Sequence, residues 1–218
     1  MTSAHRFPPT TAAGLTRRLS ALAATTALCA WSIWPAAGQA TAPVVVVVET
    51  AAGAITLAVD VEHAPVTAAN FLRYVDGKFY DGGRFIRAVR PDNTTRHDVE
   101  IQVVQAAIAP ARTGEAFPAI PLERTTATGL RHVDGALSMA RNAPDSATSS
   151  FFVVIGDQPS LDAGGARHAD GQGFAAFGRV TAGMDVVRRI QASATGTAGQ
   201  FGTETLDPPI AIVRAYRK

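Results

Sequence analysis

Residues 135–162 read GALSMARNAPDSATSSFFVVIGDQPSLD, and a glycine-rich insert then leads to GFAAFG at residues 173–178. This pattern predicts short apolar strands around polar loops, with one strand beginning at the paired aromatics Phe151 and Phe152. Because adjacent side chains on a strand point to opposite faces, one Phe can fill a core while the other lines a surface groove. The stretch therefore favours a site that holds a small apolar ring.

Short strands are also predicted on both sides of this stretch. We expect strands at residues 43–48, 55–59, 84–89, 101–108, 135–140, 150–156, 174–180 and 209–216. Two helices are expected, over residues 65–75 and 184–190, while residues 110–131 read as irregular. Many short strands with two helices favour an antiparallel barrel or sandwich over an alternating α/β fold.

The N-terminal segment has the three-part layout of a secretory signal peptide. It is basic without acids, then Ala- and Leu-rich over residues 19–34, and ends in small residues at Gly38 and Ala40. The apolar run is shorter than the ~20 residues of a membrane span. We therefore expect residues 1–40 to be a signal peptide, cleaved after Ala40, and residues 41–218 to be one exported domain, periplasmic or secreted. An uncleaved N-terminal anchor is the alternative.

Charge and cysteine content narrow the possible partners. The chain has 20 Lys and Arg against 18 Asp and Glu, but three of the arginines fall within residues 1–40. Residues 41–218 therefore carry 17 against 18, without a basic cluster, which argues against a nucleic-acid partner. The single cysteine, Cys29, also lies in the leader. We expect a monomer with no membrane span in its mature form.

Histidines are the remaining candidates for metal ligands. They are scattered without metal-binding spacing, so we expect no metal and no cofactor. They stand at His63, His97, His132 and His168 in residues 41–218. His168 lies in the insert 163–173, where a solvent-exposed loop residue is the expected state and folding back over a site is the alternative.

A set of short motifs spread over residues 44–216 carries a family resemblance. These motifs are Ala64-Pro65, Asn70-Phe71, Tyr80-Asp81-Gly82, Phe85-x-Arg87, Gln105, Leu137-Ser138-Met139-Ala140, Ser149-x-Phe151-Phe152, Leu161-Asp162 and Phe177-Gly178. In order and spacing they resemble those of cyclophilin-type peptidyl-prolyl cis-trans isomerases. The resemblance implies a mainly β fold, an eight-stranded antiparallel barrel capped by two α-helices.

The resemblance also implies an activity, rotation about X-Pro bonds in unfolded or exposed proline-containing segments, which would assist the folding of exported proteins. No covalent bond breaks in this reaction, so neither a nucleophile nor a metal is needed. Arg87 and Gln105 would be catalytic, because a guanidinium can donate to the proline nitrogen as the amide twists. The residues implied to bind substrate are Val103, Ser150, Phe152, Leu161 and Phe174.

Several positions depart from the family's usual pattern. Phe174 stands where a pocket histidine is usual, Ser150 replaces a substrate-binding glutamine, and Gln102 replaces a pocket aromatic. The other departures are Ile86, Ala106-Ala107 and Ser160. They keep open two alternatives: a catalytically weak or inactive peptide-binding or chaperone module on the same barrel, and a structural β-domain without an open groove.

Overall fold

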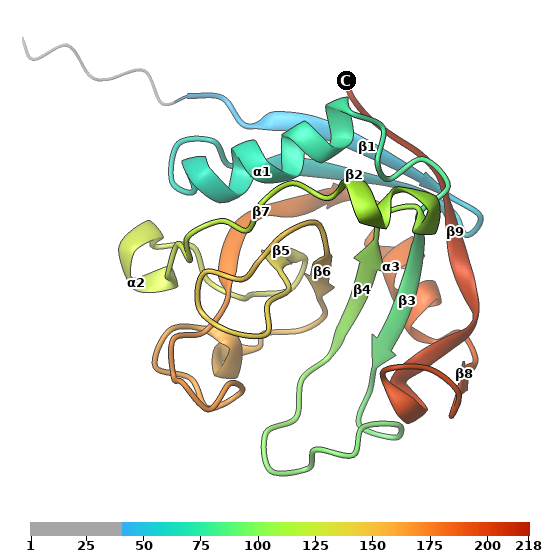
Figure 1. Cartoon of the computed structure of the whole chain (residues 1–218). Helices are drawn as coiled ribbons and strands as arrows, with labels where there is room; N and C mark the ends of the chain where they lie inside the picture. The colour runs from blue at the N-terminus through green and yellow to red at the C-terminus, as the bar shows by residue number, and fades with distance from the viewer. Residues whose placement is uncertain (1–40) are drawn as a thin grey trace, which may run out of the picture. The chain divides into compact units, whose positions relative to one another are not determined.

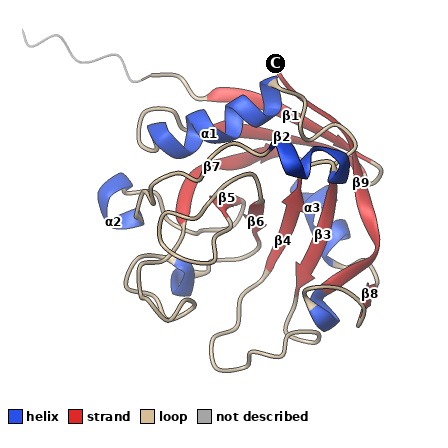
Figure 2. Cartoon of the chain, viewed as in Figure 1, coloured by secondary structure: helices blue, strands red, loops and turns tan. Residues whose placement is uncertain are grey.

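Eight antiparallel strands close into a barrel in the computed structural model, which describes residues 41–218 (Figures 1 and 2). The strands are β1 (Val44–Thr50), β2 (Gly53–Val59), β3 (Arg84–Val89), β4 (Val103–Ala107), β5 (Ala136–Met139), β6 (Phe151–Val154), β7 (Ala175–Ala182) and β9 (Thr205–Arg217). They pair in the order β1-β2-β7-β5-β6-β4-β3-β9, and β9 returns to pair with β1. A two-residue strand, β8 (Thr195–Gly196), adds to β9. The predicted barrel is confirmed, while the predicted leader lies outside the described residues.

Two amphipathic helices cover the barrel, as expected. Helix α1 (Pro65–Asp76) begins with a proline, which suits the first turn of a helix, and packs against β7 and β9. Helix α3 (Met184–Gln191) packs against β2, β3 and β4. Within residues 41–218, neither these nor the shorter helices are long and apolar enough to cross a membrane.

The segment predicted to be irregular contains two short helical turns, so that part of the prediction was wrong. They are a 3-10 helix, η1 (Pro110–Glu115), and the four-residue α2 (Thr125–Thr128). Pro110 suits the start of the first turn, and Gly129 ends the second with a φ of 74°, which glycine adopts without strain. Further 3-10 turns are η2 (Pro159–Leu161) and η3 (Gly202–Glu204).

Phe151 and Phe152 belong to two different clusters of buried side chains, as strand alternation predicts. Phe151 faces the barrel interior, where its ring lies 5.2 Å from that of Phe71 and 5.4 Å from that of Tyr80. Phe152 faces outward into a second, smaller cluster of buried side chains, made up of Val89, Ile101, Val103, Ala136, Phe152, Val154 and Leu161. This outer cluster forms the floor of the site described below.

A bulge in β3 turns Arg87 to the same outer face. Strict alternation from buried Phe85 would send Arg87 into the interior. The register of β3 instead shifts between Phe85 and Arg87 against both neighbouring strands, which leaves Ile86 unpaired. Such an extra residue redirects the side chains that follow it, so Arg87 lies outside the barrel with Ile86.

Candidate active site

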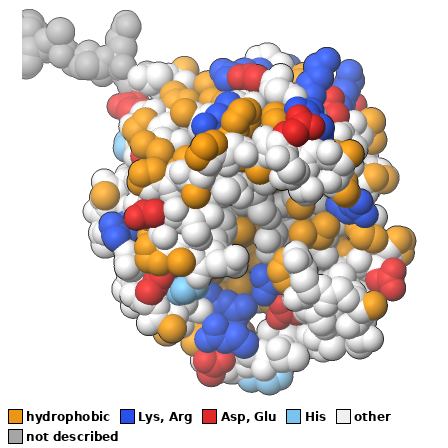
Figure 3. All heavy atoms as spheres, in the orientation of Figure 1, with side chains coloured by type: hydrophobic (Ala, Val, Ile, Leu, Met, Phe, Trp, Pro, Cys, Tyr) orange, Lys and Arg blue, Asp and Glu red, His pale blue; other side chains and the backbone are white. Residues whose placement is uncertain are grey.

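The site is built on one row of residues that face each other across neighbouring strands. Ser138 of β5 pairs with Phe152 of β6, Phe152 with Gln105 of β4, and Gln105 with Arg87 of β3. Above this row lies a cavity of about 650 Å³. Figure 3 shows a hollow on this face, with hydrophobic side chains in its depth and Lys or Arg side chains beside it. All the residues proposed from the sequence line the cavity: Arg87, Val103, Gln105, Ser150, Phe152, Leu161 and Phe174.

Arg87 is held from three directions. Its Nε and Nη2 donate to Oε2 of Glu204 at 2.8 and 2.6 Å, and its Nη1 donates to Oε1 of Gln105 at 3.3 Å. The ring of Phe201 lies 4.9 Å from the guanidinium carbon. The Arg87 side chain keeps 20% of its surface exposed. The remaining N–H groups on Nη1 and Nη2 are therefore available to a bound molecule, while the orientation of the guanidinium is set by its neighbours.

Gln105 is oriented in turn by Ser150. Gln105 Nε2 donates to Ser150 Oγ at 2.9 Å, and the Ser150 hydroxyl donates to the carbonyl oxygen of Ala106 at 2.8 Å. This directs Gln105 Oε1 towards Arg87. Ser150 thus lines the cavity and also fixes its neighbour, a task that the sequence did not indicate. Its contact with substrate stays a prediction.

The floor of the cavity is apolar and almost fully buried. Phe152, Leu161 and Val103 are exposed by 4% or less. Phe174 forms a wall, because its ring meets Phe152 edge to face at a centroid distance of 5.6 Å. Ile101, which the sequence did not indicate, belongs to the same buried cluster and also lines the cavity. The result is a pocket that can enclose a compact apolar ring next to a fixed arginine.

A buried polar group supports this floor from beneath. The His132 ring stacks on Phe152 at 6.2 Å, with Nδ1 at 2.7 Å from Asp162 Oδ1 and Nε2 at 2.9 Å from Ser138 Oγ. Since an ionised carboxylate only accepts hydrogen bonds, Nδ1 carries the proton and Nε2 accepts from the hydroxyl. Burial lowers the pKa of His132 below its ordinary value, and Asp162 opposes this in part.

Ser138, His132 and Asp162 are hydrogen-bonded in the order of a Ser-His-Asp catalytic triad, yet the serine cannot reach a substrate. Ser138 is 0% exposed and His132 is 1% exposed. Their hydrogen bonds therefore fix the position of Phe152 and of the chain around Leu161, the residue before Asp162.

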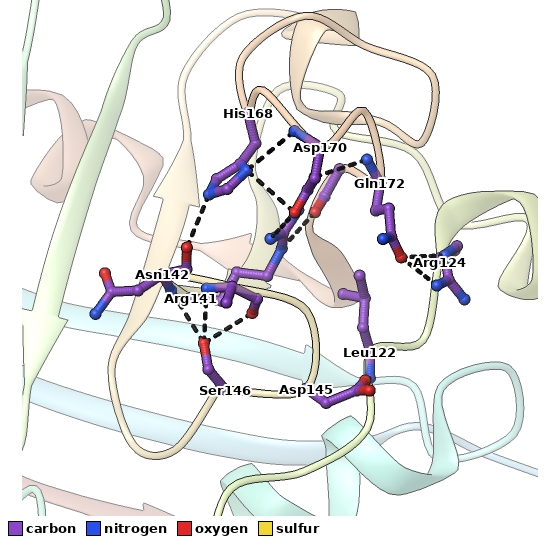
Figure 4. Close-up of polar contacts among 11 residues, drawn as sticks. Leu122, Arg124, Arg141, Asn142, Asp145, Ser146, His168, Asp170 and Gln172 are labelled. Carbon is purple, nitrogen blue, oxygen red and sulfur yellow. Dashed lines mark hydrogen bonds and ion pairs between the residues drawn. The ribbon is translucent and has the colours of Figure 1, made fainter.

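The insert 163–173 folds back onto the loop after β5 (Figure 4), and its Arg167 and His168 line the cavity. Arg141 donates to both carboxylate oxygens of Asp170, at 2.7 and 2.8 Å, and its Nε donates to the carbonyl oxygen of Gly173 at 2.7 Å. These hydrogen bonds hold the pKa of the Asp170 carboxyl well below its usual range. The guanidinium also lies 5.0 Å from the centre of the Phe174 ring.

The expectation of a solvent-exposed His168 was wrong. Its side chain is 28% exposed, its Nε2 lies 3.0 Å from the carbonyl oxygen of Asn142, and it lines the cavity. The cause is the ion pair between Arg141 and Asp170, which draws the insert onto the loop after β5 (Figure 4).

One departure from the family pattern, Gln102, lies outside the site. Gln102 is not part of the cavity lining, and its Oε1 accepts from Gln191 Nε2 of α3 at 3.3 Å.

Glu204, which anchors Arg87, was missed because 117 residues separate them and no local motif marks the carboxylate. The pairing of Arg87 with Thr205 places Glu204 there. Only a correct register for β3 and β9 could have indicated it.

Fold and site together define a class of protein: a barrel with an apolar pocket and a fixed arginine on its outer wall. Residues 45–217 match the family model described as "Cyclophilin type peptidyl-prolyl cis-trans isomerase/CLD". The chain belongs to this family.

Curated relatives agree with this assignment. The chain is 33% identical to peptidyl-prolyl cis-trans isomerase A of Dickeya dadantii, over 83% of this chain and 88% of that protein. It is 34% identical to peptidyl-prolyl cis-trans isomerase B of Escherichia coli, over 63% and 78% respectively. A cyclophilin-type isomerase structure from Cryptosporidium parvum shares the fold at a TM-score of 0.63 and 17% identity, covering 81% of this chain and 98% of that one.

Proposed function

We propose that this protein accelerates rotation about X-Pro bonds in proline-containing segments of exported polypeptides, with Arg87 acting on the twisted amide. Family membership gives the reaction, and the roles of individual residues and the cellular setting are the proposal. The observation that carries the proposal is the placement of Arg87, Gln105 and Phe152 in one row that lines the same cavity.

The chemistry requires only binding and hydrogen bonding. Amide resonance gives rotation a barrier of about 18–20 kcal/mol. As the amide twists, resonance is lost and the proline nitrogen becomes a hydrogen-bond acceptor. An N–H of Arg87 that donates to this nitrogen stabilises the twisted state and not the planar one, which is the condition for faster turnover. Because Gln105 and Glu204 already orient the guanidinium, little reorganisation accompanies the reaction.

Proline fits the apolar part of the site. Phe152, Leu161 and Val103 present carbon surface that can pack against the pyrrolidine ring, and Phe174 closes one side. A related cyclophilin-type structure from Cryptosporidium parvum was obtained in the presence of the dipeptide Ala-Pro. That likeness supports a proline-containing peptide as the occupant of this cavity.

Exchange spectroscopy by NMR tests the activity. A short peptide such as Ala-Ala-Pro-Phe interconverts between cis and trans forms over roughly tens to hundreds of seconds on its own. We expect the protein, at a small fraction of the peptide concentration, to raise the exchange rate. Peptide shifts that titrate without any gain in exchange would contradict catalysis and support the peptide-binding module instead.

Export is supported by the leader pattern of residues 1–40. Intact mass measured on protein recovered from outside the cytoplasm tests it. We expect a chain that begins at Thr41. Full-length protein confined to the cytoplasm would contradict export.

A further inference from the structure

Charge is distributed unevenly at the cavity. Among residues 41–218, four arginines and one histidine line it, namely Arg87, Arg96, Arg141, Arg167 and His168, and no Asp or Glu does. Residues 41–218 as a whole carry nearly equal numbers of basic and acidic side chains. The cavity lining is therefore more positive than residues 41–218 as a whole, and Lys or Arg side chains gather beside the hollow in Figure 3.

Three of the four arginines have carboxylate partners. Glu204 pairs with Arg87 and Asp170 with Arg141, both at short distances. Arg96 pairs with Asp98 at 3.0 Å, where the two side chains are 44% and 65% exposed, so this partner is well solvated and can be exchanged for another.

Arg167 differs from the other three. It is 9% exposed, its Nη1 donates to the carbonyl oxygen of Val99 at 2.9 Å, and no carboxylate lies within salt-bridge distance among the described residues. Arg96 Nη1 donates to the Arg167 carbonyl oxygen, which ties the two residues together. Burial lowers the pKa of Arg167, and the nearby charges of Arg96 and Arg87 lower it further, while the carboxylates of Glu204 and Asp98 oppose this in part.

A buried cation without a carboxylate in direct contact is costly, and an anion placed beside it relieves that cost. The cavity has room for one, since about 650 Å³ exceeds what a proline ring fills and is in the range that holds larger ligands. Arg167 and Leu161 line the same space, so an anion at Arg167 and a proline on the apolar floor can belong to one peptide.

We infer that this site selects X-Pro segments that carry an Asp or Glu side chain next to the proline, with the carboxylate received by Arg167 and Arg96. The inference rests on the proposed function of the same cavity and names the substrate class that it prefers.

Matched peptides test this preference. Exchange and affinity are measured by NMR for peptides with Glu, Gln or Lys before the proline, and for a second set with Glu or Gln after it. We expect the Glu peptide of one of the two sets to exceed its Gln counterpart by about fivefold in kcat/KM. Within the first set, the Lys peptide should have the lowest kcat/KM. Added salt should reduce the advantage, because it screens charge.

Variants locate the preference. Arg167→Gln and Arg96→Gln should each bring the Glu-to-Gln ratio close to one, while Arg167→Lys, which keeps the charge, should retain most of it. Arg179→Gln is the matched control, since Arg179 is exposed on β7 and does not line the cavity. Two variants are used because loss of buried Arg167 can disturb the insert, whereas Arg96 is half exposed.

The outcomes separate this inference from the proposed function. Equal values for Glu and Gln peptides in both sets, with exchange accelerated for each, would overturn the acidic preference alone. A ratio unchanged in both variants would overturn the assignment to these arginines. If no peptide shows accelerated exchange, the proposed function fails, and the ratio of dissociation constants for Glu and Gln peptides still decides the preference.

Discussion

Arg87 and Gln105 lie directly opposite each other on β3 and β4, and Arg87 Nη1 donates to Gln105 Oε1 at 3.3 Å. Gln105 is itself fixed through Ser150 to the backbone of Ala106. A chain of hydrogen bonds thus links the guanidinium of Arg87 to the backbone of β4. This explains how an arginine with three flexible methylene groups on the outer face of the barrel keeps one orientation.

Removal of the Ser150 hydroxyl should weaken catalysis without unfolding the protein. Ser150→Ala leaves Gln105 Nε2 without its acceptor, so Gln105 holds Arg87 less well. We expect kcat to fall about fivefold, as for the loss of one hydrogen bond worth about 1 kcal/mol. The assay is NMR exchange on a proline peptide, with Ser193→Ala as a control because that hydroxyl lies at the end of α3. Equal kcat in both variants would contradict the role.

Glu204 should act as a positioning residue for Arg87. Glu204→Gln keeps the size but removes the charge that holds Nε and Nη2. We expect kcat to fall by about tenfold with little change in KM, because the apolar floor is intact. Glu204→Asp should recover part of the loss. A thermal unfolding curve accompanies the assay, and a variant that melts lower but keeps its full kcat would assign Glu204 to stability alone.

The insert should loosen when its ion pair is broken. Asp170→Asn removes the negative charge that binds Nη1 and Nη2 of Arg141. We expect faster hydrogen exchange at the amides of Gly164, Arg167 and Gly171, which close the insert on itself and on η2. The control is Asp92→Asn, whose ion pair with Arg90 lies at an exposed loop. Exchange unchanged by Asp170→Asn would show that the ion pair does not hold the insert.

Stability should decline as the pH falls below about 6.5, in part through His132. Burial lowers the pKa of His132 from its ordinary value of 6.5. Below that value the unfolded chain takes up a proton that the folded chain excludes, so the free energy of unfolding falls with pH until the folded pKa is reached. At pH values above the ordinary pKa of 6.5, the contribution of neutral His132 to stability is fully present.

Denaturant unfolding between pH 7 and 5 measures this effect. His132→Gln should show a smaller loss of stability over that range than the wild type. His97→Gln is the control, because the His97 side chain is 67% exposed. Identical pH dependence in the wild type and in His132→Gln would contradict the account.

Sequence reasoning identified the floor of the site because strand alternation is a local rule. It separated Phe151 from Phe152, and the structure confirms one inside and one outside. The same rule would place Arg87 wrongly, and only the family resemblance indicated it, because the bulge at Ile86 has no glycine or other local mark.

Long-range partners were beyond the reach of the sequence. Glu204 depends on the register of β3 with β9, and the orientation of the insert depends on Arg141 meeting Asp170 across 29 residues. Arg96 and Arg167, 71 residues apart, likewise show no local basic cluster, although they face one cavity. Folding creates each of these pairs, so neither composition nor spacing indicates them.

We expect Arg87 to stabilise the twisted X-Pro amide. Exchange spectroscopy on one proline peptide with the wild type, Arg87→Ala and Arg84→Ala measures it most directly, because Arg84 lies on the same strand but does not line the cavity. Arg87→Ala should lower kcat/KM by about 100-fold, as for the loss of a transition-state donor, and Arg84→Ala should stay near the wild type. Wild-type turnover in a folded Arg87→Ala variant would contradict it.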